Sequence, residues 1–119
     1  MRNVTLLDNV DASVQQISNE VNFDHRGQWK LLITSSGLDG TPQLFIEEGF
    51  TGGKCLDPPT EWFIICNPCN DTGVYFPIDD DIITIEKNSI KGNWMRVRVE
   101  ADDNTTGNIT VKLGYKTFP

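Results

Sequence analysis

The chain has 119 residues, 38% of them hydrophobic and 23% charged, which is the size and composition of one globular domain. Its net charge of −7 argues against nucleic acid and anionic lipid as partners, because both require clustered Lys and Arg. No apolar run of about 18 residues could span a bilayer, and no signal-peptide pattern follows Met1. We therefore expect no membrane partner and synthesis in a cytosol.

The first segment that could form regular structure lies near residues 11–21, and its pattern is ambiguous. Hydrophobic residues recur at helical spacing, and a polar residue at the start could cap a short helix. The same stretch can form a strand, which we favour because the rest of the chain has a β pattern throughout. The residues at helical spacing are Val10, Val14, Ile17 and Val21, with Asp11 or Ser13 as the cap.

Short β-type segments follow, each bounded by Gly, Pro, Asn or Asp. Such segments at intervals of about 8–12 residues are typical of a β-sandwich or barrel. The predicted strands in the middle of the chain are residues 29–34, 43–48, 61–66, 74–76 and 82–86.

The C-terminal part predicts a hairpin with one face exposed to water. In residues 94–100, Met95, Val97 and Val99 alternate with polar or larger residues, and residues 109–116 alternate in the same way. The polar stretch 101–107 between them forms the turn. We predict an all-β chain: one antiparallel β-sandwich over residues 1–119, with at most one short helix near residues 11–21.

Catalytic residues are scarce. The one histidine, His25, lies in a turn-like stretch at residues 23–27, and a Ser–His or Cys–His pair needs such a base beside a nucleophile. A solvated turn histidine is the favoured interpretation. We predict a protein that is not an enzyme and has no cofactor.

Three cysteines are the sharpest departure from an ordinary β domain. Cys66 and Cys69 form a C-x-x-C pair, and Cys55 precedes them. With His25 they could complete a zinc site, two of them could form a disulfide, or all could be free thiols, which we favour. A small zinc or redox protein is therefore one alternative function.

Two acidic turns could supply oxygen ligands to Ca²⁺. Neither has the spacing of an EF-hand loop, so solvated carboxylates are the favoured interpretation. The candidate ligands are Asp79, Asp81, Asp102 and Asp103.

Trp94, Arg96 and Arg98 lie on the polar side of their predicted strand and form the candidate interface. Trp and Arg are enriched where proteins bind one another, and the two arginines could pair with carboxylates of a neighbouring subunit. Three tryptophans, Trp29, Trp62 and Trp94, could stack on sugar rings if exposed, with Trp94 the best candidate. Together with the acidic turns, they make a carbohydrate-binding or lectin-like module another alternative. Against both, tryptophan is usually buried and strand arginines are usually solvated.

Three segments in order, residues 27–40, 94–100 and 106–116, resemble small β-sandwich virion proteins of tailed bacteriophages, of the capsid decoration (auxiliary capsid) or head-fibre kind. The resemblance implies a jelly-roll or Ig-like sandwich, made in the host cytoplasm and located in the virion. It implies binding to the major capsid protein or other virion proteins, self-association, and no catalytic residue. A short exposed N-terminus, residues 1–8, would dock on the shell or a neighbouring copy.

Overall fold

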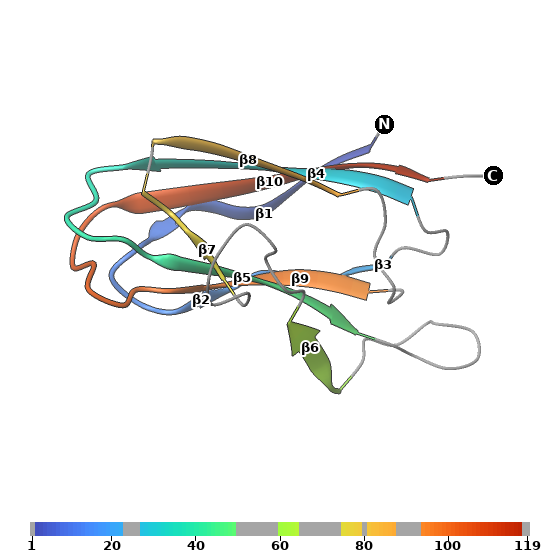
Figure 1. Cartoon of the computed structure of the whole chain (residues 1–119), viewed down its shortest axis with the longest axis horizontal. Helices are drawn as coiled ribbons and strands as arrows, with labels where there is room; N and C mark the ends of the chain where they lie inside the picture. The colour runs from blue at the N-terminus through green and yellow to red at the C-terminus, as the bar shows by residue number, and fades with distance from the viewer. Residues whose placement is uncertain are drawn as a thin grey trace.

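A computed structural model describes residues 2–22, 27–49, 60–64, 75–79, 81–87 and 94–117. These residues form ten strands and no helix, and the strands build two sheets that pack face to face (Figure 1). The prediction of an antiparallel β-sandwich is confirmed. Residues 11–21 contain no helix, and the strand interpretation is confirmed by two short strands, β2 (Gln16–Ile17) within this stretch and β3 (Val21–Asn22), which begins at its last residue.

The two sheets differ in size, and all their neighbouring strands are antiparallel. The four-stranded sheet has the order β1 (Arg2–Asp11), β10 (Asn108–Thr117), β4 (Gly27–Ser36), β8 (Ile82–Lys87). In the six-stranded sheet β9 (Trp94–Glu100) and β5 (Gln43–Gly49) lie in the centre. There β2 and β3 pair with β9, whereas β6 (Trp62–Ile64) and β7 (Phe76–Pro77) pair with β5.

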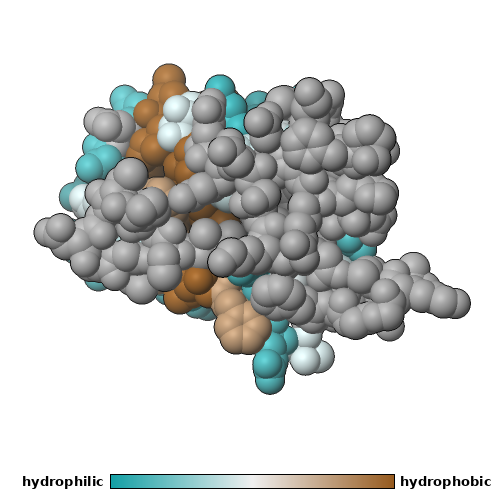
Figure 2. Space-filling view, turned by 45° about the vertical axis from the view of Figure 1, so that its right-hand side comes forward, coloured by the Kyte–Doolittle hydropathy of each residue, from teal (hydrophilic) through white to brown (hydrophobic). Residues whose placement is uncertain are grey.

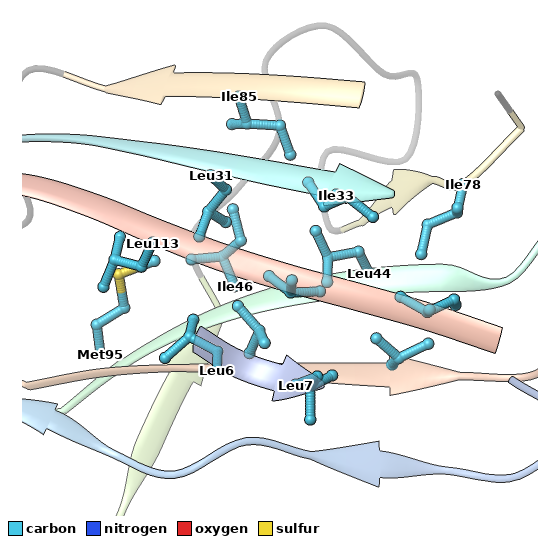
Figure 3. Packing of buried hydrophobic residues seen from close by; sticks show 14 of the residues in the cluster. Leu6, Leu7, Leu31, Ile33, Leu44, Ile46, Ile78, Ile85, Met95 and Leu113 are labelled. Atoms are coloured by element: carbon cyan, nitrogen blue, oxygen red, sulfur yellow. The ribbon is translucent and has the colours of Figure 1, made fainter. Parts of the chain in front are cut away.

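The core lies between the sheets and follows the period-two pattern of the sequence. Met95, Val97 and Val99 of β9 are completely buried, as their alternation predicts. They face aliphatic residues of the four-stranded sheet, several of which are labelled in Figure 3. Full burial of one such side chain contributes about 1.5–3 kcal/mol, so this layer supplies most of the stabilisation. Other fully buried core residues are Leu31, Ile33, Leu44, Ile46, Ile78, Ile109, Val111 and Leu113.

The N-terminal segment corrects one expectation. Residues 2–8 are not an exposed arm, because they belong to β1, which pairs with β10 along its length. Leu6 and Leu7 are neighbours in the chain, yet both are buried in the core. Strict alternation would expose one of them, but the pairing with β10 shifts register on either side of Leu7. Asn9, in the second irregular stretch, has a φ of 50°.

The other predicted strands are found with small changes at their ends. Residues 29–34, 43–48 and 82–86 all lie within observed strands. The predicted strand 61–66 is observed as β6, although residues 65–66 lie outside the described part of the chain. The predicted strand 74–76 overlaps β7 at Phe76, and residue 74 is also outside the described part.

A buried asparagine joins three turns at one end of the sandwich. The side-chain oxygen of Asn104 accepts hydrogen bonds from the backbone N–H groups of Asp39 and Gly40, both at 3.0 Å. Its side-chain nitrogen donates to the carbonyl oxygens of Ala12 at 3.0 Å and Thr106 at 2.7 Å. All four hydrogen-bonding positions of the amide are used, so Asn104 fixes how the strands connect at this end.

Candidate contact face of the six-stranded sheet

The outer surface of the six-stranded sheet follows from the register of β9, β5 and β6. Residues directly opposite each other on paired strands point to the same side of a sheet. Because Met95, Val97 and Val99 point into the core, Arg96 and Arg98 point outward. From these outward positions we select nine residues as the contact face, including Ile17 of β2, opposite Arg98, and Tyr75, whose ring lies against that of Phe45. They are Ile17, Phe45, Glu47, Trp62, Ile64, Tyr75, Arg96, Arg98 and Glu100.

A network of opposite charges lies at the centre of the contact face. Glu47 is only 6% exposed, and its Oε1 accepts from Nε of Arg96 at 2.9 Å. Its other oxygen lies 3.6 Å from Nε of Arg98. Arg98 also pairs with Glu100, which in turn accepts from Gln15 at 2.6 Å. Two cations and two anions thus cancel on this face.

Each guanidinium also lies over an aromatic ring. The Cζ atom of Arg96 is 4.4 Å from the centre of the Trp62 ring, and that of Arg98 is 4.2 Å from the centre of the Phe45 ring. Phe45 extends the row, with its ring centre 5.9 Å from that of Tyr75. The contacts are within the range of a cation–π interaction. Ring and carboxylate together hold each arginine in one position.

Trp94 is 8% exposed, so it is buried, as is usual for tryptophan, and is not the exposed residue that a sugar platform would need. Its partner on β5 is Gly49, and the partner of Gly49 on the far side is Trp62. Because Gly49 has no side chain, the position between Trp94 and Trp62 in this row is open to an indole ring. Trp29 is buried in the core and the ring of Trp62 is covered by Arg96, so these residues form no open platform for a sugar.

Arg96 and Arg98 correct a second expectation. Both were expected to be solvated or to pair with a neighbouring subunit, but their partners are Glu47 and Glu100 of the same chain. The structure thus brings the two predicted arginines together with a residue that the sequence analysis missed, Glu47. The alternation within β5 could have identified it, because Glu47 lies two residues after Phe45 in an uninterrupted strand and therefore points to the same side of the sheet.

Aliphatic and aromatic side chains surround the charged centre. Ile17, opposite Arg98, is 48% exposed, and Ile64, opposite Glu47, is also exposed. Phe63 and Val14 lie exposed nearby in sequence. Hydrophobic surface is visible at the lower edge of the molecule in Figure 2. The contact face therefore combines neutral charge, aromatic rings and exposed aliphatic groups.

The outer surface of the four-stranded sheet is different in kind. Its outward positions are mostly threonine, asparagine and lysine, as expected for a surface in contact with water. A shallow hollow of about 440 Å³ lies around Gly114, where the outward position has no side chain. The described outward residues lie in three rows of cross-strand neighbours: Asn3, Lys30 and Gly114 in the first, Thr5, Leu32, Thr84 and Lys112 in the second, and Thr34, Ile82 and Thr110 in the third.

The residues predicted for metal binding receive little support where they are described. Asp79, Asp81, Asp102 and Asp103 are exposed, and Asp103 accepts a hydrogen bond from the backbone N–H of Thr41 at 2.8 Å. Among the described residues, no three His, Cys, Asp or Glu side chains lie close enough to hold a metal ion. The remaining candidates, Cys55, Cys66, Cys69 and His25, lie outside the described part of the chain.

No protein-family model matches the sequence, and no curated protein is significantly similar to it. Within the described residues, no helix is long and apolar enough to cross a membrane.

Proposed function

We propose that this chain is a non-catalytic protein-binding module that docks through the contact face of its six-stranded sheet. The observation that carries the proposal is the difference between the two outer surfaces. One is rich in threonine, asparagine and lysine and has one strongly exposed aliphatic residue among those described, Ile82, whereas the other presents aromatic rings, arginines and several exposed hydrophobic residues. Tyr, Trp, Phe and Arg are the residues most enriched in protein interfaces.

Charge supports the same choice of face. The chain has a net charge of −7, so most of its surface repels other acidic proteins. On the contact face the charges of Arg96 and Arg98 cancel those of Glu47 and Glu100. An acidic protein can bring this face against a partner with less electrostatic cost than the rest of its surface.

The arginines are also held in place before any partner arrives. Ordering a long side chain at an interface costs about 0.5–1.5 kcal/mol, and this cost opposes binding. Arg96 is fixed by Glu47 and Trp62, and Arg98 by Glu47 and Phe45. Their remaining N–H groups can donate to carbonyl or carboxylate oxygens of a partner without that loss.

The partner that we propose is the outer surface of a viral capsid, with this chain as a decoration protein. The support is the resemblance of residues 27–40, 94–100 and 106–116 to virion proteins of tailed bacteriophages. Residues 94–100 are β9, the strand that carries Arg96 and Arg98 to the centre of the contact face. A shell offers many identical sites, and a weak contact can suffice where copies bind side by side.

Glycan binding is less well supported than it was from the sequence. Its motivation was three tryptophans and the acidic turns, but Trp29 and Trp94 are buried and Arg96 lies over the ring of Trp62.

Co-sedimentation with empty capsids of the virus that encodes the chain tests the proposal. We expect the wild-type protein to pellet with capsids and Ile17→Glu to lose at least tenfold in affinity, since it places a charge on the contact face. Thr5→Glu adds the same charge to the exposed outer surface of the four-stranded sheet and should bind like wild type. No binding by the wild type, or equal loss in both variants, would refute the proposal, as would absence of the protein from purified virions by mass spectrometry.

A further inference from the structure

The four edges of the two sheets are not equally protected against pairing. An edge strand exposes unpaired backbone N–H and C=O groups, and natural proteins usually shorten, bend or cover such strands. The edges of the six-stranded sheet are strands of two or three residues, and β1 is interrupted by two register shifts. By contrast, β8 is six residues long and keeps regular register with β4. Within the described residues, no strand pairs with its other side.

The backbone groups on the outer side of β8 can be identified from one hydrogen bond. The N–H of Ser35 donates to the carbonyl oxygen of Asp81 at 2.9 Å, and in this register the two residues lie opposite each other. In antiparallel pairs, alternate residues bond to the same neighbour. Residues 83 and 85 therefore bond to β4, whereas residues 82, 84 and 86 direct their N–H and C=O groups away from it.

The side chains of β8 also favour pairing on this side. Residues 82–85 are Ile-Ile-Thr-Ile, a β-branched run with no proline or charge to discourage a further strand. Ile85 is buried and Ile83 half-buried, which fixes β8 on the core. Ile82 is 67% exposed, the largest exposed fraction among the exposed large hydrophobic residues of the described chain.

We propose that β8 pairs antiparallel with β8 of a second copy of this chain, about a two-fold axis through Thr84. In this register Thr84 lies opposite Thr84 of the second copy, Ile82 opposite Glu86, and Asp81 opposite Lys87. Residues 82, 84 and 86 provide the outward N–H and C=O groups on both strands, so every one of them finds a partner. Asp81 and Lys87 carry opposite charges, which favours a second copy of the same strand over an unrelated peptide.

The dimer would have a further consequence for binding. A two-fold axis perpendicular to the four-stranded sheet joins both copies into one sheet of eight strands and leaves both contact faces on the same side. If the proposed function is correct, the dimer can engage two sites on one surface, which raises its apparent affinity. The dimer itself does not depend on that function.

Light scattering of the purified protein tests the pairing. We expect a mass twice the 13.4 kDa of one chain, and one chain for Thr84→Pro, because proline removes an outward N–H without removing a bond to β4. Thr84→Val keeps that N–H and should remain a dimer. Far-UV circular dichroism confirms that each variant is folded. A wild-type monomer at 100 µM (a concentration at which a dimer with a Kd of about 1 µM is formed), or a dimeric and folded Thr84→Pro, would overturn the proposal.

A pair of charge variants tests the register without altering the backbone. Ile82→Glu places a carboxylate opposite Glu86 of the second copy and should raise the dimer Kd at least tenfold, whereas Ile82→Lys should leave it unchanged or lower it. Equal effects of the two variants would overturn the register, whatever Thr84→Pro does. Ile17→Glu should remain a dimer, so that failure of capsid binding and failure of dimerisation are distinguishable.

Discussion

Glu47 and Arg96 lie directly opposite each other on the two central strands of the six-stranded sheet, with Glu47 Oε1 2.9 Å from Arg96 Nε. The same carboxylate also neutralises Arg98, two residues further along β9. One buried carboxylate thus faces two half-buried guanidiniums. No other described carboxylate of the contact face pairs with two cations. Its removal therefore leaves both arginines short of a partner.

Glu47→Gln should destabilise the fold by about 1–3 kcal/mol, because breaking a charge pair of low exposure leaves the remaining charges uncompensated. Glu100→Gln is the matched control, since Glu100 is more exposed and pairs with Arg98 alone among the cations. A pair that is partly open to solvent, such as Arg98–Glu100, contributes less than about 1 kcal/mol. Urea unfolding at pH 7 measures both. Equal losses in the two variants would contradict the central role of Glu47.

Asn104→Asp should destabilise the fold by about 2–4 kcal/mol at neutral pH. The change preserves shape and both acceptor contacts, to Asp39 and Gly40. It replaces the two donated hydrogen bonds with a carboxylate oxygen facing the carbonyl oxygens of Ala12 and Thr106. Thermal unfolding measures the loss, and the exposed Asn108→Asp controls for the added charge. If the two variants melt together, the amide is not the connection between the turns.

Two glycines in the neighbouring turns should respond differently to alanine. Gly107 has a φ of 95°, and a Cβ there would lie 2.5 Å from the carbonyl oxygen of Ser36. Gly37 has a φ of 71°, but a Cβ there would meet its nearest atom at 3.5 Å, an ordinary contact. Gly37→Ala should therefore cost about 1–2 kcal/mol, from the left-handed backbone alone, and Gly107→Ala distinctly more. Chemical unfolding measures both, and a smaller loss for Gly107→Ala would contradict the steric argument.

The sequence predicts the core well wherever a strand is regular. Met95, Val97 and Val99 alternate without interruption, and all three are buried. The first strand was missed because its register shifts place Leu6 and Leu7, neighbours in the chain, both in the core. Period-two patterns cannot show such a bulge, because it depends on the pairing with another strand.

The contact face was partly predicted, for a related reason. Arg96 and Arg98 were identified from their parity on β9, but their acid, Glu47, lies 49 residues away from Arg96 in sequence. Trp94 has the same parity as the arginines and lies beside Gly49 of β5, and it is nevertheless buried. Parity gives the side of the sheet, while burial on that side depends on the neighbouring strands.

Acid should weaken the fold through Asp39. The hydroxyl and then the backbone N–H of Thr105 donate to this carboxylate and hold its pKa below the ordinary value of 3.8. A carboxyl whose pKa is lower in the folded state stabilises the fold above its unfolded pKa, and that stabilisation is lost as the pH falls through the folded pKa. We therefore expect the urea concentration at the unfolding midpoint of the wild type to decrease at pH values below about 4.

Asp39→Asn isolates this contribution, because the amide does not titrate in that range. At pH 7 the variant should be less stable than the wild type, and the difference between them should shrink as the pH falls below 3.8. Asp8→Asn, an exposed residue of β1, makes the same change in net charge and controls for it. Urea midpoints from pH 2 to 7 give the comparison (a range chosen to bracket ordinary carboxyl pKa values of about 4). If the difference in urea midpoint between wild type and Asp39→Asn does not change with pH, protonation of Asp39 does not affect stability and the argument from its contact with Thr105 is wrong.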